Sequence, residues 1–192
     1  MASLTKSIRV ITVAPIMALA AMLILWCRLP EIFGGTENLL FAILFLTVLP
    51  ISAYPLQPFI PKFKDMGRKG QRSLAIVMAV IGYIFGIVYG LAKRVPDGLL
   101  LIFMSYLFSG LLILLFNKGL HIRASGHACG VMGPIAYLYY FIGAAALFGV
   151  IIWLAVLWSS LNLRRHKLSD LILGSVLPVL AVVISEVLLG LF

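Results

Sequence analysis

Residues 128–165 read ACGVMGPIAYLYYFIGAAALFGVIIWLAVLWSSLNLRR. This stretch is apolar over most of its length, and one membrane crossing by a helix takes roughly 20 residues. It can therefore supply two crossings, Ala128–Phe141 and Ala144–Trp158 with their flanks, joined by a short glycine turn. The chain would leave one membrane face at His127 and return to that face at His166, so that two distant histidines can meet in one site.

The composition of the chain makes the lipid bilayer the solvent for most of it. Hydrophobic residues make up 63% of the 192 residues, charged residues make up 11%, and the mean hydropathy is +1.16. A water-soluble domain cannot bury that fraction of apolar side chains. The apolar runs are continuous and about twenty residues long, whereas transmembrane barrels show alternating segments of about ten. We therefore expect an all-α bundle of transmembrane helices.

The apolar runs predict about seven membrane spans in a single domain. The predicted spans are Val10–Cys27, Asn38–Ile60, Ser73–Ala92, Gly98–Phe116, Ala128–Phe141, Ala144–Trp158 and Leu171–Leu191. Residues 1–37 form an additional N-terminal helix and loop, and residues 38–192 hold the other six helices.

The charges of the loops predict an orientation. With seven spans, 12 of the 15 lysines and arginines fall on one face and three on the other. Five of the 12 lie in the two histidine loops, and without them the count is still seven basic residues against three. The positive-inside rule places this face, and with it the histidines, in the cytoplasm. The net charge of +9 then reflects orientation and attraction to anionic lipid headgroups. Nucleic-acid binding is not expected, because the short basic loops contain no basic module interleaved with aromatic residues.

His166 and Asp170 have the spacing of neighbours on one helix face. A carboxylate bonded to one ring nitrogen fixes the histidine tautomer and raises the basicity of the other nitrogen, as a nucleophilic histidine requires. Asp170 also opens an apolar helix, where a carboxylate caps the first turn. Taken alone, this segment fits a simple helix cap equally well.

The segment Ser125-Gly126-His127 stands directly before the apolar run described first. A Ser-Gly turn at a helix start offers a hydroxyl and backbone N–H groups to an anion, and Arg123 adds a forked donor suited to phosphoryl oxygens. Taken with His166 on the same face, the segment provides a cationic cradle, a nucleophile and a second titratable group. These are the groups that phosphoryl transfer needs.

These residues resemble the type-2 phosphatidic acid phosphatase superfamily. Its second motif is Pro-Ser-Gly-His, which residues 125–127 match without the proline. Its third motif is Ser-Arg, five residues, His, three residues and Asp, which Ser159, His166 and Asp170 match at the family's spacing. The resemblance covers about residues 38–192 as a six-helix core. It implies that His166 attacks phosphorus to form a phosphohistidine, Asp170 orients it and His127 protonates the leaving alkoxide, with no metal or other cofactor.

The chain departs from the family pattern at the phosphate-binding residues. The arginine expected after Ser159 is Ser160 here, and the family's first motif, Lys, six residues, Arg-Pro, is not intact. We expect Arg123 to replace the missing arginine, with Arg164 or the basic loop Lys62–Arg72 as alternatives. The candidate phosphate-binding residues are Arg123, Ser125, Gly126, Lys118, Arg164, Lys64 and Arg72.

The expected function is hydrolysis of lipid phosphates. Isoprenyl phosphates or diphosphates are favoured, because the compact loops leave little room to recognise a large headgroup. The six acidic residues have no two within three positions of each other, so no carboxylate cluster for a metal-dependent lipid transferase exists. Two alternatives remain: a transporter, for which only Glu186 supplies a charge well inside a span, and a lipid-phosphate-binding relative that lost catalysis with the arginine.

Overall fold

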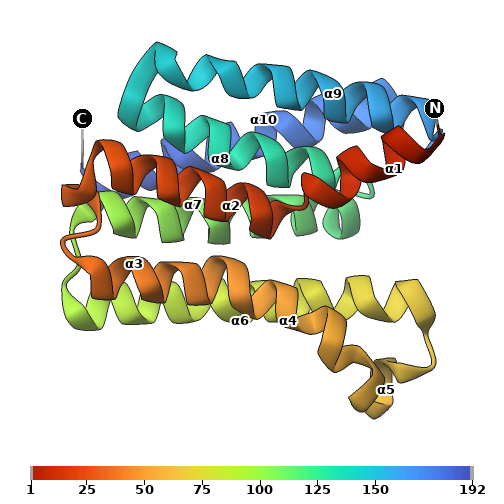
Figure 1. The fold of residues 1–192 in the computed structure, drawn as a ribbon, viewed down its shortest axis with the longest axis horizontal. Helices are drawn as coiled ribbons and strands as arrows, with labels where there is room; N and C mark the ends of the chain where they lie inside the picture. Colours follow the sequence, from red (N-terminus) through yellow and green to blue (C-terminus); the bar gives the residue numbers. More distant parts are fainter. Residues whose placement is uncertain (1, 191–192) are drawn as a thin grey trace.

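The computed structural model describes residues 2–190, and these are helical with no strand. The α-helices, shown in Figure 1, are α1 (Ala2–Ile11), α2 (Ala14–Arg28), α3 (Thr36–Ile43), α4 (Leu49–Leu56), α5 (Pro61–Lys64), α6 (Gly67–Lys93), α7 (Asp97–Leu114), α8 (Gly126–Ile142), α9 (Gly149–Asn162) and α10 (Leu168–Leu189). Short 3-10 or π-helical segments adjoin them: η1 (Pro30–Ile32), η2 (Leu44–Val48), η3 (Gln57–Phe59), η4 (Leu115–Gly119) and η5 (Gly143–Phe148). The all-α prediction is confirmed.

Within the described residues 2–190, five helical segments are long and apolar enough to cross a membrane. They are Thr36–Phe59, Gly67–Lys93, Asp97–Gly119, Gly126–Asn162 and Leu168–Leu189. The 37-residue segment is not straight: the chain turns at Gly143, whose φ is +58°, and α8 and α9 pack side by side as a hairpin (Figure 1). The apolar helix α2 has 15 residues and is shorter than these segments.

The first predicted span, Val10–Cys27, is not one helix. The structure ends α1 at Ile11 and begins α2 at Ala14, with Pro15 as the second residue of the new helix. Proline has no N–H to donate to the preceding turn and disfavours helical conformation in the residue before it. The prolines of the second predicted span do not break its helix. Thr36–Phe59 stays helical throughout, with a π-helical segment at Leu44–Val48.

The N-terminal helix α2 lies in the main hydrophobic core. Its residues Ala18, Met22 and Leu25 are fully buried and belong to the same cluster as Leu99 and Phe103 of α7. Helix α2 also packs on α8, and α10 packs on both α7 and α8. Residues that precede the predicted six-helix core are therefore part of the packed interior.

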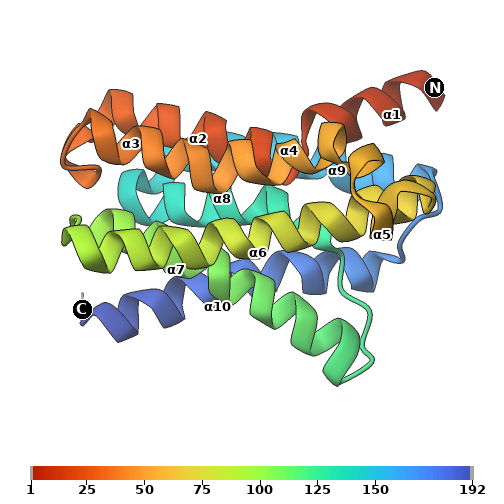
Figure 2. The ribbon, with the colours of Figure 1, turned by 90° about the horizontal axis from the view of Figure 1, so that it is seen from below.

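One end of the bundle collects the segments with candidate site residues. Figure 1 shows α1, α5 and the beginnings of α6, α8 and α10 towards the same end, with the α2–α3 and α6–α7 connections at the other. Figure 2 shows the last turns of α7, with η4, projecting away from the other helices. This arrangement brings both histidine loops together with the start of the chain.

Candidate active site

The Ser125 loop is fixed against the first turn of α10. Ser125 is fully buried, and its hydroxyl accepts a hydrogen bond of 3.3 Å from the N–H of Ala128, as a helix N-cap does. Its own N–H donates to the backbone carbonyl of Asp170 at 2.8 Å. The two motifs, more than forty positions apart, are thus joined by a backbone hydrogen bond.

Gly174 makes this close contact possible. A Cβ atom added at Gly174 would collide with the carbonyl oxygen of Ser125 and would lie 2.9 Å from its nitrogen. Backbone atoms cannot rotate away as the end of a flexible side chain can, so only glycine allows this approach. Sequence reasoning missed Gly174, because a single glycine in an apolar helix carries no signal of what lies opposite.

We expect Gly174→Ala to lower the thermal unfolding temperature and the activity of the protein. The added methyl group would push the Ser125 loop off α10, and overpacking of this kind costs about 1–3 kcal/mol. The matched control is Gly133→Ala on α8, where the new Cβ would lie at an ordinary 3.6 Å from Pro178. Thermal unfolding in detergent compares the two, and equal unfolding temperatures would show that the contact is not tight.

The carboxylate of Asp170 gathers three donors on one oxygen. Its Oδ2 lies 3.3 Å from Nδ1 of His166, accepts the N–H of Lys167 at 3.2 Å and lies 3.5 Å from Nε of Arg123. The side chain of Asp170 is only 8% exposed. The predicted pairing of His166 with Asp170 is therefore present in the structure, and Asp170 caps the first turn of α10 as well.

The ring of His166 is oriented by the carboxylate of Asp170. Because Nδ1 faces a carboxylate, it carries the ring proton, and Nε2 keeps its lone pair. Burial lowers the pKa of His166 below its usual value, and the charges of Arg123 and Arg9 act in the same direction, whereas Asp170 opposes the shift. A lowered pKa favours the neutral imidazole, which is the form that a nucleophilic histidine uses.

His127 lies within electrostatic reach of His166 and is held by α1. Its Nε2 lies 3.1 Å from the hydroxyl oxygen of Thr12, whose proton is donated to the Ile8 carbonyl at 2.7 Å. A hydroxyl has one proton to donate, so Thr12 accepts here and His127 donates from Nε2. Thr12 is a second residue that the sequence did not point to.

Arg123 links the two motif loops. Besides the contact with Asp170, its Nη2 donates to the backbone carbonyl of Arg165 at 2.9 Å. Its side chain is 66% exposed. Two of its guanidinium nitrogens, Nε and Nη2, thus contact the protein, and its role as the replacement phosphate clamp stays a prediction.

Arg9 of α1 occupies the place beside Ser160. Its Nη1 donates to the hydroxyl of Ser160 at 2.9 Å, and the next residue back, Ser159, donates to the carbonyl of Thr5 at 2.8 Å. Burial lowers the pKa of the Arg9 guanidinium, and the charges of Arg165 and Arg72 lower it further. Sequence analysis counted Arg9 only as an orientation signal, because nothing in the sequence joins α1 to a motif 150 positions away.

The other predicted phosphate-binding residues lie at varied places. Gly126 is the exposed first residue of α8, and Arg72 lies in the first turns of α6 within electrostatic reach of Arg9. Lys64 is exposed in α5, Arg164 is exposed between α9 and α10, and Lys118 is exposed in the projecting segment η4. The charge of Arg72 therefore acts on Arg9, and no such interaction is described for Lys64, Arg164 or Lys118.

Residues 2–190 contain no group of three histidine, cysteine or acidic side chains placed to hold a metal ion. The cations described around the histidines are arginine side chains. The expectation of a metal-independent reaction remains a prediction.

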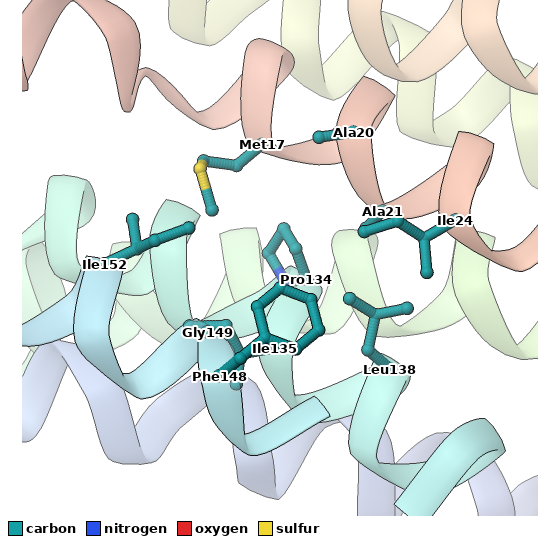
Figure 3. Close-up of a pocket in the computed structure, with 10 residues that line it drawn as sticks. All are labelled: Met17, Ala20, Ala21, Ile24, Pro134, Ile135, Leu138, Phe148, Gly149 and Ile152. Carbon is teal, nitrogen blue, oxygen red and sulfur yellow. The ribbon is translucent and has the colours of Figure 1, made fainter. Parts of the chain in front are cut away.

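A small apolar pocket lies between three helices, further along α8 from His127. Figure 3 shows it between α2, α8 and α9, with Met17, Ile135, Leu138 and Ile152 among its walls. His127 stands on the same helix as Ile135, eight residues earlier, which is about 12 Å along the helix axis. The pocket is small, and its lining is apolar.

Comparison of the chain with protein-family models, with curated proteins and with solved structures gives no match.

Proposed function

We propose that this protein is an integral membrane phosphatase that hydrolyses lipid phosphates through a phosphohistidine. The observation that supports it best is the convergence of His166, held by the Asp170 carboxylate, with His127 and several arginines from distant parts of the chain. The resemblance of the two motifs to the type-2 phosphatidic acid phosphatases supports the same reaction.

The reaction takes place in two balanced steps. Nε2 of His166 attacks phosphorus, the bond from phosphorus to the ester oxygen breaks, and His127, which enters this step as the imidazolium, gives a proton to the leaving alkoxide and becomes neutral. Water then attacks the phosphohistidine while His127 takes a proton from it. The bond between nitrogen and phosphorus breaks, and inorganic phosphate leaves.

The chain crosses the membrane about seven times in this proposal. The five long segments supply six crossings when α8 and α9 are counted separately, and α2 supplies the seventh. The excess of basic residues at the end with the histidines favours a cytoplasmic site. Both arguments rest on length, hydropathy and charge.

The favoured substrates are isoprenyl phosphates or diphosphates. The short loops leave little room for a large headgroup, and the apolar pocket beside Met17 and Ile135 lies about 12 Å along α8 from His127, where a later part of an apolar chain would run. The hydrocarbon would lie at membrane depth while the phosphate meets the histidines near the bilayer surface.

Phosphate release from a panel of lipid phosphates tests this function. We expect purified protein to release phosphate from isoprenyl phosphates or diphosphates faster than from phosphatidic acid or phosphatidylglycerol phosphate. The rate should be unchanged in excess EDTA, because arginines rather than a metal ion neutralise the phosphoryl charge. In sealed vesicles, hydrolysis of added substrate should require the inside-out orientation.

Three outcomes would contradict parts of this proposal. Loss of activity on chelation with recovery on adding magnesium would replace the mechanism. Hydrolysis by right-side-out vesicles would reverse the orientation. Absence of phosphate release from every lipid would leave a transporter or a non-catalytic lipid-binding protein as the function.

A further inference from the structure

Arg9 stands where the motif lacks its arginine. The family pattern predicts an arginine at the position of Ser160, and the chain instead brings a guanidinium to that position from α1. Nη1 of Arg9 lies 2.9 Å from the Ser160 hydroxyl oxygen. The positive charge therefore lies close to the position that the side chain of an arginine at residue 160 would start from. The short serine leaves the space that the Arg9 side chain uses.

The charges around Arg9 are not balanced within the described part of the chain. Among the side chains that the structure describes, the carboxylate of Asp170 forms an ion pair with Arg123 and also faces the imidazole of His166. Arg9 instead feels the positive charges of Arg165 and Arg72, and it is itself half-buried. A half-buried arginine that is repelled by exposed arginines nearby is stabilised when an anion binds between them.

The positive charge of Arg9 also acts on both histidines. Its charge acts on His127 and on His166, which are 39 positions apart in the sequence. Arg9 is the arginine whose charge is felt by both histidines, whereas that of Arg123 is felt by His166. An anion that contacts both histidines is therefore within range of the Arg9 guanidinium.

Helix α1 is held rigidly enough to place this guanidinium. The buried hydroxyl of Ser159 donates to the Thr5 carbonyl, and Thr12 at the end of α1 accepts from His127. Helix α1 packs on α9 along this contact. Two anchors on either side of Arg9 fix its backbone before any ligand arrives, which reduces the entropy lost on binding.

We propose that Arg9 binds the phosphoryl oxygens of the substrate and so replaces the arginine absent at Ser160. This assignment rests on the proposed phosphatase function and makes the N-terminal helix part of the active site. Arg123, by contrast, is largely exposed and contacts Asp170 and the Arg165 carbonyl, so its role is to hold the two loops together.

The key comparison is between Arg9→Gln and Ser160→Ala. The first removes the charge, whereas the second removes the hydrogen bond to α9 and keeps the guanidinium. We expect Arg9→Gln to lower kcat/KM on the order of 10²–10³-fold, the usual loss for one charged donor to a transition state. Ser160→Ala should lower kcat/KM less than about tenfold. Arg28→Ala, at the other end of the bundle, is the control for removing an arginine far from the site.

Binding of inorganic phosphate gives a readout independent of turnover. Isothermal titration calorimetry of the full chain in detergent should show binding by the wild-type protein and by Arg28→Ala. Arg9→Gln should bind about 10–100-fold more weakly, as expected for loss of a charge-assisted hydrogen bond. If Arg9→Gln does not fold, Arg9→Lys, which keeps the charge but loses the fork, should still lose about tenfold or more in kcat/KM.

Several results would overturn the assignment. One is a kcat/KM for Arg9→Gln, or for Arg9→Lys, equal to that of the wild-type protein. Another is a loss for Ser160→Ala as large as that for Arg9→Gln, because Arg9 would then only tie α1 to α9. If the wild-type protein hydrolyses no lipid phosphate, the proposed function is wrong. If the wild-type protein and Arg9→Gln bind inorganic phosphate with equal affinity, Arg9 does not bind the phosphoryl group, whatever the function is.

Discussion

Replacing His166 with Gln is expected to abolish phosphate release. The side chain of His166 is 15% exposed and loses its attacking nitrogen in this variant, while glutamine keeps a similar volume and a polar end near Asp170. Removing the nucleophile of a covalent mechanism lowers kcat on the order of 10⁴–10⁶-fold, because the remaining groups then act on water alone. The fold should be retained, since the Lys167 N–H still caps onto Asp170.

The measurement is phosphate release together with trapping of the intermediate. Wild-type protein quenched during turnover of a ³²P-labelled lipid phosphate should carry a label that is stable in base and lost in acid, and His166→Gln should carry none. The matched control is His121→Asn, which replaces the exposed third histidine by a residue that tolerates its φ of +56°. An active His166→Gln protein would exclude the mechanism.

The sequence was sufficient to predict the helical fold and the meeting of the two motifs. Hydropathy alone predicts long apolar helices, and the alternation of faces then requires His127 and His166 to lie at one end. The structure adds the contact that fixes the two motifs against each other. The N–H of Ser125 donates to the carbonyl of Asp170, and Gly174 leaves room for the Ser125 backbone. Such a contact depends on which helix lies opposite a glycine, and local patterns do not contain that information.

The part of the site contributed by α1 could not be predicted from the sequence. Pro15 marks a break in the first apolar run, yet a break does not say that the helix before it will lie along α9. Arg9 and Thr12 reach the site through contacts spanning 151 and 115 positions. An arginine and a threonine are common residues near a membrane surface, so their types carry no signal of a site. Only the tertiary contacts show that Arg9 and Thr12 lie beside the two motifs.

The second large effect is expected for Asp170→Asn, which preserves shape and removes charge. The amide oxygen of the asparagine can still cap α10, but the side chain no longer stabilises the imidazolium or favours the tautomer with the proton on Nδ1 of His166. Loss of this orientation in a histidine–aspartate pair lowers kcat by about 10⁴-fold in a comparable catalytic arrangement. The ion pair with Arg123, at 3.5 Å and beside a largely exposed side chain, adds little to this effect.

The pH profile separates orientation from a merely structural role. Asp170 raises the pKa of His166 against the lowering by burial and arginines, so its removal should lower that pKa further. Activity that requires neutral His166 rises as pH increases through this pKa, and the acid limb of kcat/KM should therefore move to lower pH in Asp170→Asn. A structural role would lower the rate at every pH and leave the limb in place. An unshifted limb together with wild-type thermal unfolding would mean that Asp170 does not act on His166, and the second histidine, His127, would then be the residue to test as nucleophile.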